Sequence, residues 1–191
     1  WYYDRPDYVA IWWIIYVVAA FIYAIVKAGE VKFVQTLAGI FAVVAIPYSF
    51  AAFLRMQAAG IHRAYLLLPF ILSFACDTFA YFAGRAFGKH KLAPKVSPGK
   101  TVEGLAGGIV LSGIVAVAFS QSAAHTLPVL AASAAAIVFS VMGDLTESMF
   151  KRSAGVKDSS NLLPGHGGVL DRVDSLTAAL PVYLAVLSVL G

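Results

Sequence analysis

The apolar residues of this chain gather in six long runs that are separated by polar stretches. About 20 consecutive apolar residues are enough for a helix to cross the roughly 30 Å hydrocarbon core of a bilayer. The runs approach or exceed this length and predict transmembrane helices over residues 9–26, 33–54, 65–83, 105–120, 127–143 and 173–190. The expected fold class is therefore all-α, a polytopic transmembrane helical bundle with about six spans in this chain.

The composition supports the same class, because 60% of the 191 residues are hydrophobic and only 13% are charged. A water-soluble domain of this size could not easily cover its surface with so little polar material. The chain begins at Trp1, and the aromatic residues that follow it are typical of a membrane interface. We expect that the natural N-terminus is missing and that residues 1–64 form N-terminal membrane helices.

The basic residues are distributed unevenly between the two sides of such a bundle. If the six spans alternate in direction, eleven of the 14 Lys and Arg residues fall on one side, and the other three are Arg5, Arg55 and Arg63. Cytoplasmic segments of membrane proteins carry an excess of these residues. The loops 85–103 and 144–174 are therefore predicted to face the cytoplasm. They are also the only long polar stretches, so we expect the chemistry there.

The second of these loops begins and ends with acidic side chains at helical spacing. One helix face carries four polar residues, Asp144, Glu147, Ser148 and Lys151. Asp171 and Asp174, three residues apart, open the last span. If the last two spans pack side by side, carboxylates from both would surround one cation. Oxygen ligands of this kind suit Mg²⁺ better than zinc.

Acidic side chains at membrane depth are costly and normally face a protein interior or an aqueous cavity. A functional role is therefore expected for Asp144, Asp171 and Asp174, whereas Glu147 fits a solvated surface acid and a metal-supporting role equally well. The glycines at 165, 167 and 168 allow a phosphate to approach the backbone closely. His166 between them either contacts phosphate or transfers a proton, or else only orders the turn.

The first polar loop combines an intramembrane acid, Asp77, with basic residues and a Ser-Pro-Gly-Lys-Thr segment at 97–101. Lysine, serine and threonine side chains neutralise and hydrogen-bond a triphosphate, although the same positive charges also serve as an orientation signal. The segment is not a P-loop, because Pro94 stands where the first glycine is required. Glycine pairs four residues apart, at 84 and 88 and at 104 and 108, indicate close helix packing.

The residues of the second loop resemble the signature of the phosphatidate cytidylyltransferases. The matching pattern is Ser148-x-Phe150-Lys151-Arg152-x₄-Lys157-Asp158-x-Ser160-x₂-Leu163-Pro164-x-His166-Gly167-Gly168-Val169-x-Asp171-Arg172-Val173-Asp174, without a departure. Two further segments look like that family, Asp77-Thr78-x-Ala80-Tyr81 and Ser97-Pro98-x-Lys100-Thr101-x-Glu103-Gly104. The resemblance runs from about residue 66 to the end of the chain.

The resemblance implies a Mg²⁺-dependent enzyme of the bacterial inner membrane that acts at the cytoplasmic face, and it implies homodimers. It also implies a second cation such as K⁺ and metal-binding roles for Asp144 and Asp171. Residues 65–191 would then be the catalytic membrane domain, with cytoplasmic loops that bind CTP and metal. The expected partners are CTP, phosphatidic acid and the lipid bilayer, and no nucleic acid partner is expected.

The expected reaction joins CTP and phosphatidic acid to give CDP-diacylglycerol and pyrophosphate, with no covalent enzyme intermediate. The catalytic candidates are Lys151, Asp144 and Asp171, and the metal candidates are Asp144, Asp171, Asp77 and Asp174. The substrate-binding candidates are Ser97, Lys100, Thr101, Arg152, Lys157, His166, Gly167, Gly168 and Arg172.

Two alternatives remain open from the sequence. Another membrane enzyme that uses CTP on a lipid, such as a polyprenol kinase or a cytidylyltransferase for ether lipids, would carry similar loops. An ion-coupled transporter would place ionisable groups near mid-membrane in several helices. The predicted second, fourth and sixth spans have almost uniformly apolar centres, which disfavours transport.

Overall fold

The structure of the protein is a computed structural model that describes residues 63–94, 96–121, 126–156, 158–159, 168 and 170–190. Short pieces before residue 63 are also described, at 15, 18–19, 47–48, 50–55 and 57–58. The predicted spans 9–26 and 33–54 thus lie mostly outside the described residues. The division of the chain at residue 64 stays a prediction.

The described part contains four long helices, α3 (Arg63–Phe87), α4 (Val102–Ser120), α5 (Thr126–Ser153) and α6 (Leu170–Leu190). Each is long and apolar enough to cross a membrane, which confirms the polytopic helical class and the last four predicted spans. Helix α5 continues ten residues beyond the predicted end at residue 143. Its polar residues therefore lie on the last turns of the membrane helix itself and not in a loop.

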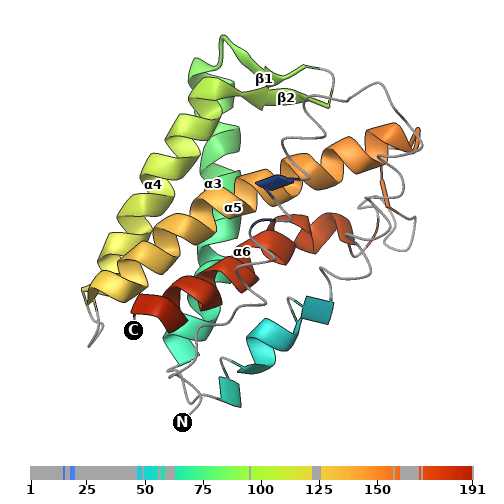
Figure 1. The fold of residues 1–191 in the computed structure, drawn as a ribbon. Coiled ribbons are helices and arrows are strands. Elements are labelled where there is room, and N and C mark those ends of the chain that lie inside the picture. Colours follow the sequence, from blue (N-terminus) through green and yellow to red (C-terminus); the bar gives the residue numbers. More distant parts are fainter. Residues whose placement is uncertain are drawn as a thin grey trace.

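The helices form two pairs, α3 with α4 and α5 with α6 (Figure 1). Helix α6 is the most enclosed of the four, because 67% of its most apolar stretch is buried, whereas the corresponding share for α4 is only 22%. The core between the helices is built from side chains such as Leu68, Leu72, Ala132 and Tyr183, all below 1% exposed. Helix α5 contacts all three other long helices, whereas α6 is the most buried of the four and α4 the least.

Small residues bring α3 and α4 into close contact. A Cβ atom added at Gly108 would lie 2.8 Å from the Cys76 carbonyl oxygen and 2.9 Å from the Ala80 Cβ. At Gly104 it would lie 2.6 Å from the Ala80 carbonyl oxygen. Small residues are what allow membrane helices to approach each other so closely. The packing role predicted for these glycines is confirmed.

A short antiparallel hairpin, β1 (Lys91–Ala93) and β2 (Ser97–Thr101), connects α3 to α4 at one end of the bundle (Figure 1). The sequence did not predict it, because proline and glycine within Ser97–Thr101 disfavour a strand. The hairpin is stabilised from outside instead. Thr101 ends β2 and caps α4, where its hydroxyl accepts a hydrogen bond of 3.1 Å from the Gly104 N–H.

We predict that Gly108→Ala destabilises the protein by about 1–3 kcal/mol, because the new methyl group overpacks the α3–α4 contact. The matched control on the same helix is Gly113→Ala, where nothing lies within 4 Å of the new Cβ. This change should be neutral or stabilise by about 0.5–1 kcal/mol, as expected for alanine in a helix. Thermal unfolding in detergent measures both, and equal midpoints for the two variants would contradict the packing role of Gly108.

Candidate active site

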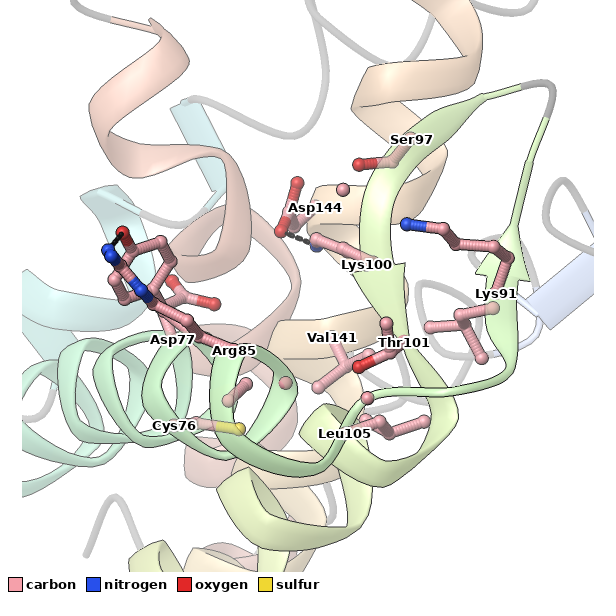
Figure 2. A pocket seen from close by; sticks show the side chains of 16 residues that line it. Cys76, Asp77, Arg85, Lys91, Ser97, Lys100, Thr101, Leu105, Val141 and Asp144 are labelled. Carbon is pink, nitrogen blue, oxygen red and sulfur yellow. Dashed lines mark hydrogen bonds and ion pairs between the residues drawn. The ribbon is translucent and has the colours of Figure 1, made fainter.

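A cavity of about 470 Å³ lies between α3, the hairpin and α5. Its wall combines residues of the segment 76–105, from α3, the hairpin and the start of α4, with Val141 and Asp144 of α5, and Figure 2 shows their side chains gathered around one space. The charged and hydroxyl-bearing residues of the wall are Asp77, Tyr81, Arg85, Lys91, Ser97, Lys100, Thr101 and Asp144. Leu105 and Val141 add an apolar part of the wall.

The ion pair between Lys100 and Asp144 joins the hairpin to α5 across this cavity (Figure 2). Both side chains are largely shielded, at 30% and 17% exposed. The other carboxylate oxygen of Asp144 accepts a hydrogen bond of 3.3 Å from the Ser148 hydroxyl. Asp144 therefore stands at the wall of the cavity with a cation on one oxygen and a hydroxyl on the other.

A second polar cluster lies between α5 and α6. The Lys151 ammonium is 2.6 Å from a Glu147 carboxylate oxygen and 2.7 Å from an Asp171 oxygen. The three side chains are only 16%, 4% and 8% exposed. A buried carboxylate needs such a partner, because an uncompensated charge at such a depth is expensive. Lys151 thus ties the end of α5 to the start of α6.

Asp171 also organises the chain that leads into α6. Its carboxylate accepts hydrogen bonds from the backbone N–H and hydroxyl of Ser159, at 2.9 and 2.8 Å, and from the Gly168 N–H at 2.7 Å. Burial acts to raise the pKa of Asp171, but the bonds from Lys151, Gly168 and Ser159 outweigh it and lower this pKa below its usual range. Asp171 is therefore ionised at neutral pH.

Asp144 connects the two parts of the site. Its carboxylate interacts electrostatically with that of Asp77 on α3 and with that of Asp174 on α6. Glu147, one turn further along α5, interacts with Asp171 and Asp174. Five acidic residues of three helices thus lie within electrostatic reach of one another, and we call them the acidic array: Asp77, Asp144, Glu147, Asp171 and Asp174. Lys151 bridges Glu147 and Asp171, so acids of α5 and α6 do lie close together, whereas their arrangement around one metal ion stays a prediction. Glu147 is buried and is not a solvated surface acid.

The donor chemistry of this array fits a hard divalent cation. Five carboxylates face only two lysines among the described side chains, Lys100 and Lys151, and oxygen ligands are those that Mg²⁺ prefers. Within the described residues no three acidic, His or Cys side chains are grouped as a ready-made metal cage. Mg²⁺ is often bound by only one or two carboxylates together with substrate phosphates and water, and metal binding at Asp144 and Asp171 stays a prediction.

The predicted substrate-binding residues differ in where the structure places them. Ser97, Lys100 and Thr101 line the cavity, although the Thr101 hydroxyl also caps α4. The Arg152 Nε donates to the Val96 carbonyl oxygen at 3.2 Å, so this residue holds the turn of the hairpin. Gly168 reaches the site through its N–H group. Lys157, His166, Gly167 and the Arg172 side chain lie outside the described residues, and their roles stay predictions.

Ser159 was missed by sequence reasoning, although it makes three of the hydrogen bonds to Asp171. The family pattern includes the neighbouring Ser160 and leaves position 159 open, so no sequence signal pointed to Ser159. Tyr81 was named only as part of a family motif, and its hydroxyl accepts a bond of 3.2 Å from Arg85 at the wall of the cavity. Its i, i+4 spacing from Arg85 was the available signal.

Comparison with known proteins gives one family. Residues 2–190 match the model of the Cytidylyltransferase family. The chain is 56% identical over 130 residues to the phosphatidate cytidylyltransferase of Haemophilus influenzae, which covers 64% of this chain and 45% of that protein. It is 52% identical over 130 residues to the protein of the same name from Pseudomonas aeruginosa, with 66% and 48% covered.

A third relative, the phosphatidate cytidylyltransferase of Staphylococcus haemolyticus, is 38% identical over 163 residues, with 84% of this chain and 62% of that protein covered. The chain spans about half the length of the first two relatives.

We predict that Lys151→Met lowers the free energy of unfolding by about 3 kcal/mol, because it leaves the buried Glu147 and Asp171 without their shared cation. Adding Glu147→Gln removes one of the stranded charges, so the double variant should be more stable than Lys151→Met alone. Lys89→Met, at an exposed position near the hairpin, is the control. Thermal unfolding in detergent is measured for the parent, for each single variant and for the double variant. If the effects of the two changes simply add, Lys151 and Glu147 are not coupled.

Proposed function

Since the chain belongs to the Cytidylyltransferase family, we propose that it carries out the reaction for which its relatives are named, the transfer of a cytidylyl group from CTP to phosphatidic acid. The products are CDP-diacylglycerol and pyrophosphate. One observation carries the proposal. The cavity between α3, the hairpin and α5 joins basic side chains for phosphates to an acidic array at Asp144.

The basic side chains of the cavity suit a nucleoside triphosphate. Arg85, Lys91 and Lys100 come from α3, β1 and β2 and line the same space, so they surround a bound anion from several sides. Charge-assisted hydrogen bonds of this kind are stronger than neutral ones. Within the described part of the chain Lys100 makes one ion pair, with Asp144, and its ammonium has two further N–H groups to offer to a phosphate.

The reaction needs positioning more than proton transfer. A phosphate oxygen of phosphatidic acid attacks the α-phosphorus of CTP and forms the new P–O bond, while the bond from that phosphorus to the oxygen that bridges to the β-phosphate breaks. The electron pair of the broken bond leaves with pyrophosphate. The attacking phosphate is already anionic at neutral pH, so the protein has to bring together anions that repel each other. Cationic side chains on facing elements serve that purpose.

Asp144 and Asp171 are the residues we assign to Mg²⁺, which when bound would offset the charge that builds up on the leaving pyrophosphate. Each of these carboxylates is held by a lysine, Lys100 or Lys151. The lysines offset part of the negative charge of the array, and Lys100 lines the cavity that the phosphates would enter. Asp77 and Asp174 flank Asp144 and are assigned a supporting role. A second cation such as K⁺ is part of the same proposal.

The lipid substrate is expected to come from the bilayer. Leu105 and Val141 give the cavity an apolar wall beside its charged one, which suits an amphipathic substrate. We further propose that the hairpin end of the bundle faces the cytoplasm of a bacterial inner membrane, where CTP is available. A homodimer is proposed on the family resemblance.

The proposal predicts that the protein, in detergent with phosphatidic acid and Mg²⁺, moves label from α-³²P-CTP into an organic-extractable lipid. Asp144→Ala and Asp171→Ala should each lower the rate at least about a hundredfold, because each removes a carboxylate assigned to the metal. Lys89→Met, outside the cavity wall, should keep the activity. Chelation of divalent cations with EDTA should abolish the reaction, and added Mg²⁺ should restore it.

Parallel reactions with γ-³²P-CTP separate the alternatives. A polyprenol kinase would transfer the γ-phosphate, so only the γ-label would reach a lipid, and an ether-lipid enzyme would prefer an ether-linked acceptor to phosphatidic acid. A folded, monodisperse protein that labels no lipid from either nucleotide would overturn the proposal and support transport instead.

A further inference from the structure

Glu103 holds together the two ends of the hairpin that forms one wall of the cavity. Its carboxylate lies in the first turn of α4 and accepts hydrogen bonds from the backbone N–H groups of Lys89, at 3.0 Å, and His90, at 3.2 Å. One carboxylate oxygen is also 2.6 Å from the His90 Nδ1. One side chain thus binds the residues that lead directly into β1.

This contact closes the open end of the hairpin. Strand β1 begins at Lys91 and pairs with Thr101 at the end of β2, while the Val102 N–H donates to the His90 carbonyl oxygen at 2.9 Å. His90 is therefore bonded through its carbonyl group to Val102 and through its N–H to Glu103. We call this set of contacts, made by Glu103 and Val102 to Lys89 and His90, the hairpin clasp.

The hairpin needs such a fastening because its own pairing is weak. Strand β1 has only three residues, the register shifts between Lys91 and Ala93, and two-stranded hairpins are marginal in water. At its far end the turn is held by the Arg152 hydrogen bond to Val96. The hairpin carries Lys91, Ser97 and Lys100 to the cavity, so its position decides where these side chains stand.

Among the described residues that line the cavity Glu103 does not appear, so the role we assign to it acts through the hairpin. Its location in the first turn of α4 also favours the helix electrostatically. That role needs a negative charge but no particular acceptor geometry. The directed contacts to two consecutive N–H groups and to an imidazole nitrogen indicate more than a helix-end charge.

We propose that Glu103 is a positioning residue for nucleotide binding, which acts through the hairpin clasp to place Lys91, Ser97 and Lys100 at the cavity. The kinetic part of this proposal rests on the proposed cytidylyltransferase function. The clasp orders a binding surface before the nucleotide arrives. Loss of the clasp should therefore weaken CTP binding and leave the lipid side of the reaction unaffected.

The experiment compares Glu103→Ala, Glu103→Gln and His90→Ala. We expect Glu103→Ala to raise the KM for CTP about tenfold while kcat and the KM for phosphatidic acid stay within about twofold. Glu103→Gln keeps an oxygen that accepts from the backbone N–H groups and should restore most of the CTP affinity. His90→Ala keeps both N–H donors and should change the KM for CTP by less than about twofold.

Hydrogen exchange measures the clasp without any activity. The amides of residues 89–101 should exchange faster in Glu103→Ala than in the parent, while those of α5 and α6 should not change. If the hairpin amides exchange faster in Glu103→Ala but the parent labels no lipid, the clasp is supported and the proposed enzymatic function is overturned.

Three results would overturn the positioning role. Unchanged hairpin exchange and an unchanged KM for CTP in Glu103→Ala would show that the contacts hold nothing in place. A fall in kcat together with a fall in thermal stability would show that Glu103 supports the fold as a whole. Failure of Glu103→Gln to restore CTP affinity would assign the effect to the negative charge at the start of α4.

Discussion

Buried negative charge has to be compensated, and the polar end of this bundle is arranged around that constraint. Helix α5 leaves the apolar core with Asp144 and Glu147 on one face, and neither carboxylate faces bulk water. The hairpin supplies Lys100 to Asp144, while Lys151 neutralises Glu147 and Asp171 together. Since the Lys100–Asp144 and Lys151–Asp171 pairs each join two elements, the compensation of charge also fastens the hairpin and α6 to the end of α5.

The rest of the described bundle allows these charges to meet. The glycines of α4 let its backbone approach α3 closely, and the same α3–α4 end carries the hairpin. Thr101 and Glu103 lie at the junction of β2 and α4 and hold the open end of that hairpin. Arg152, on α5, holds its turn. Close helix packing in the membrane part thus supports a polar end in which contacts of Lys100, Lys151, Glu103 and Arg152 join different elements.

The polar end of the bundle holds cationic and acidic side chains close together. Lys100 lies at the cavity beside Asp144, and Lys151 lies in the neighbouring cluster between Glu147 and Asp171. The Asp171 carboxylate is held ionised by Lys151, Ser159 and Gly168. A fixed charge pattern of this kind orients reactants with little reorganisation during the reaction.

The sequence by itself determined the class of the protein and which polar residues are candidates for its chemistry. Long apolar runs predict membrane helices because a helix satisfies its backbone hydrogen bonds within one segment of the chain. The spacing of Asp144, Glu147, Ser148 and Lys151 predicts that they share one helix face. Only the tertiary structure decided which charges pair, that α5 extends to Ser153, and that the 91–101 segment is a hairpin. The pairs link residues 20 and 44 positions apart, and the strands depend on Thr101 and Glu103 contacts instead of their own propensity. The local pattern of residue types does not show which distant residues will pair.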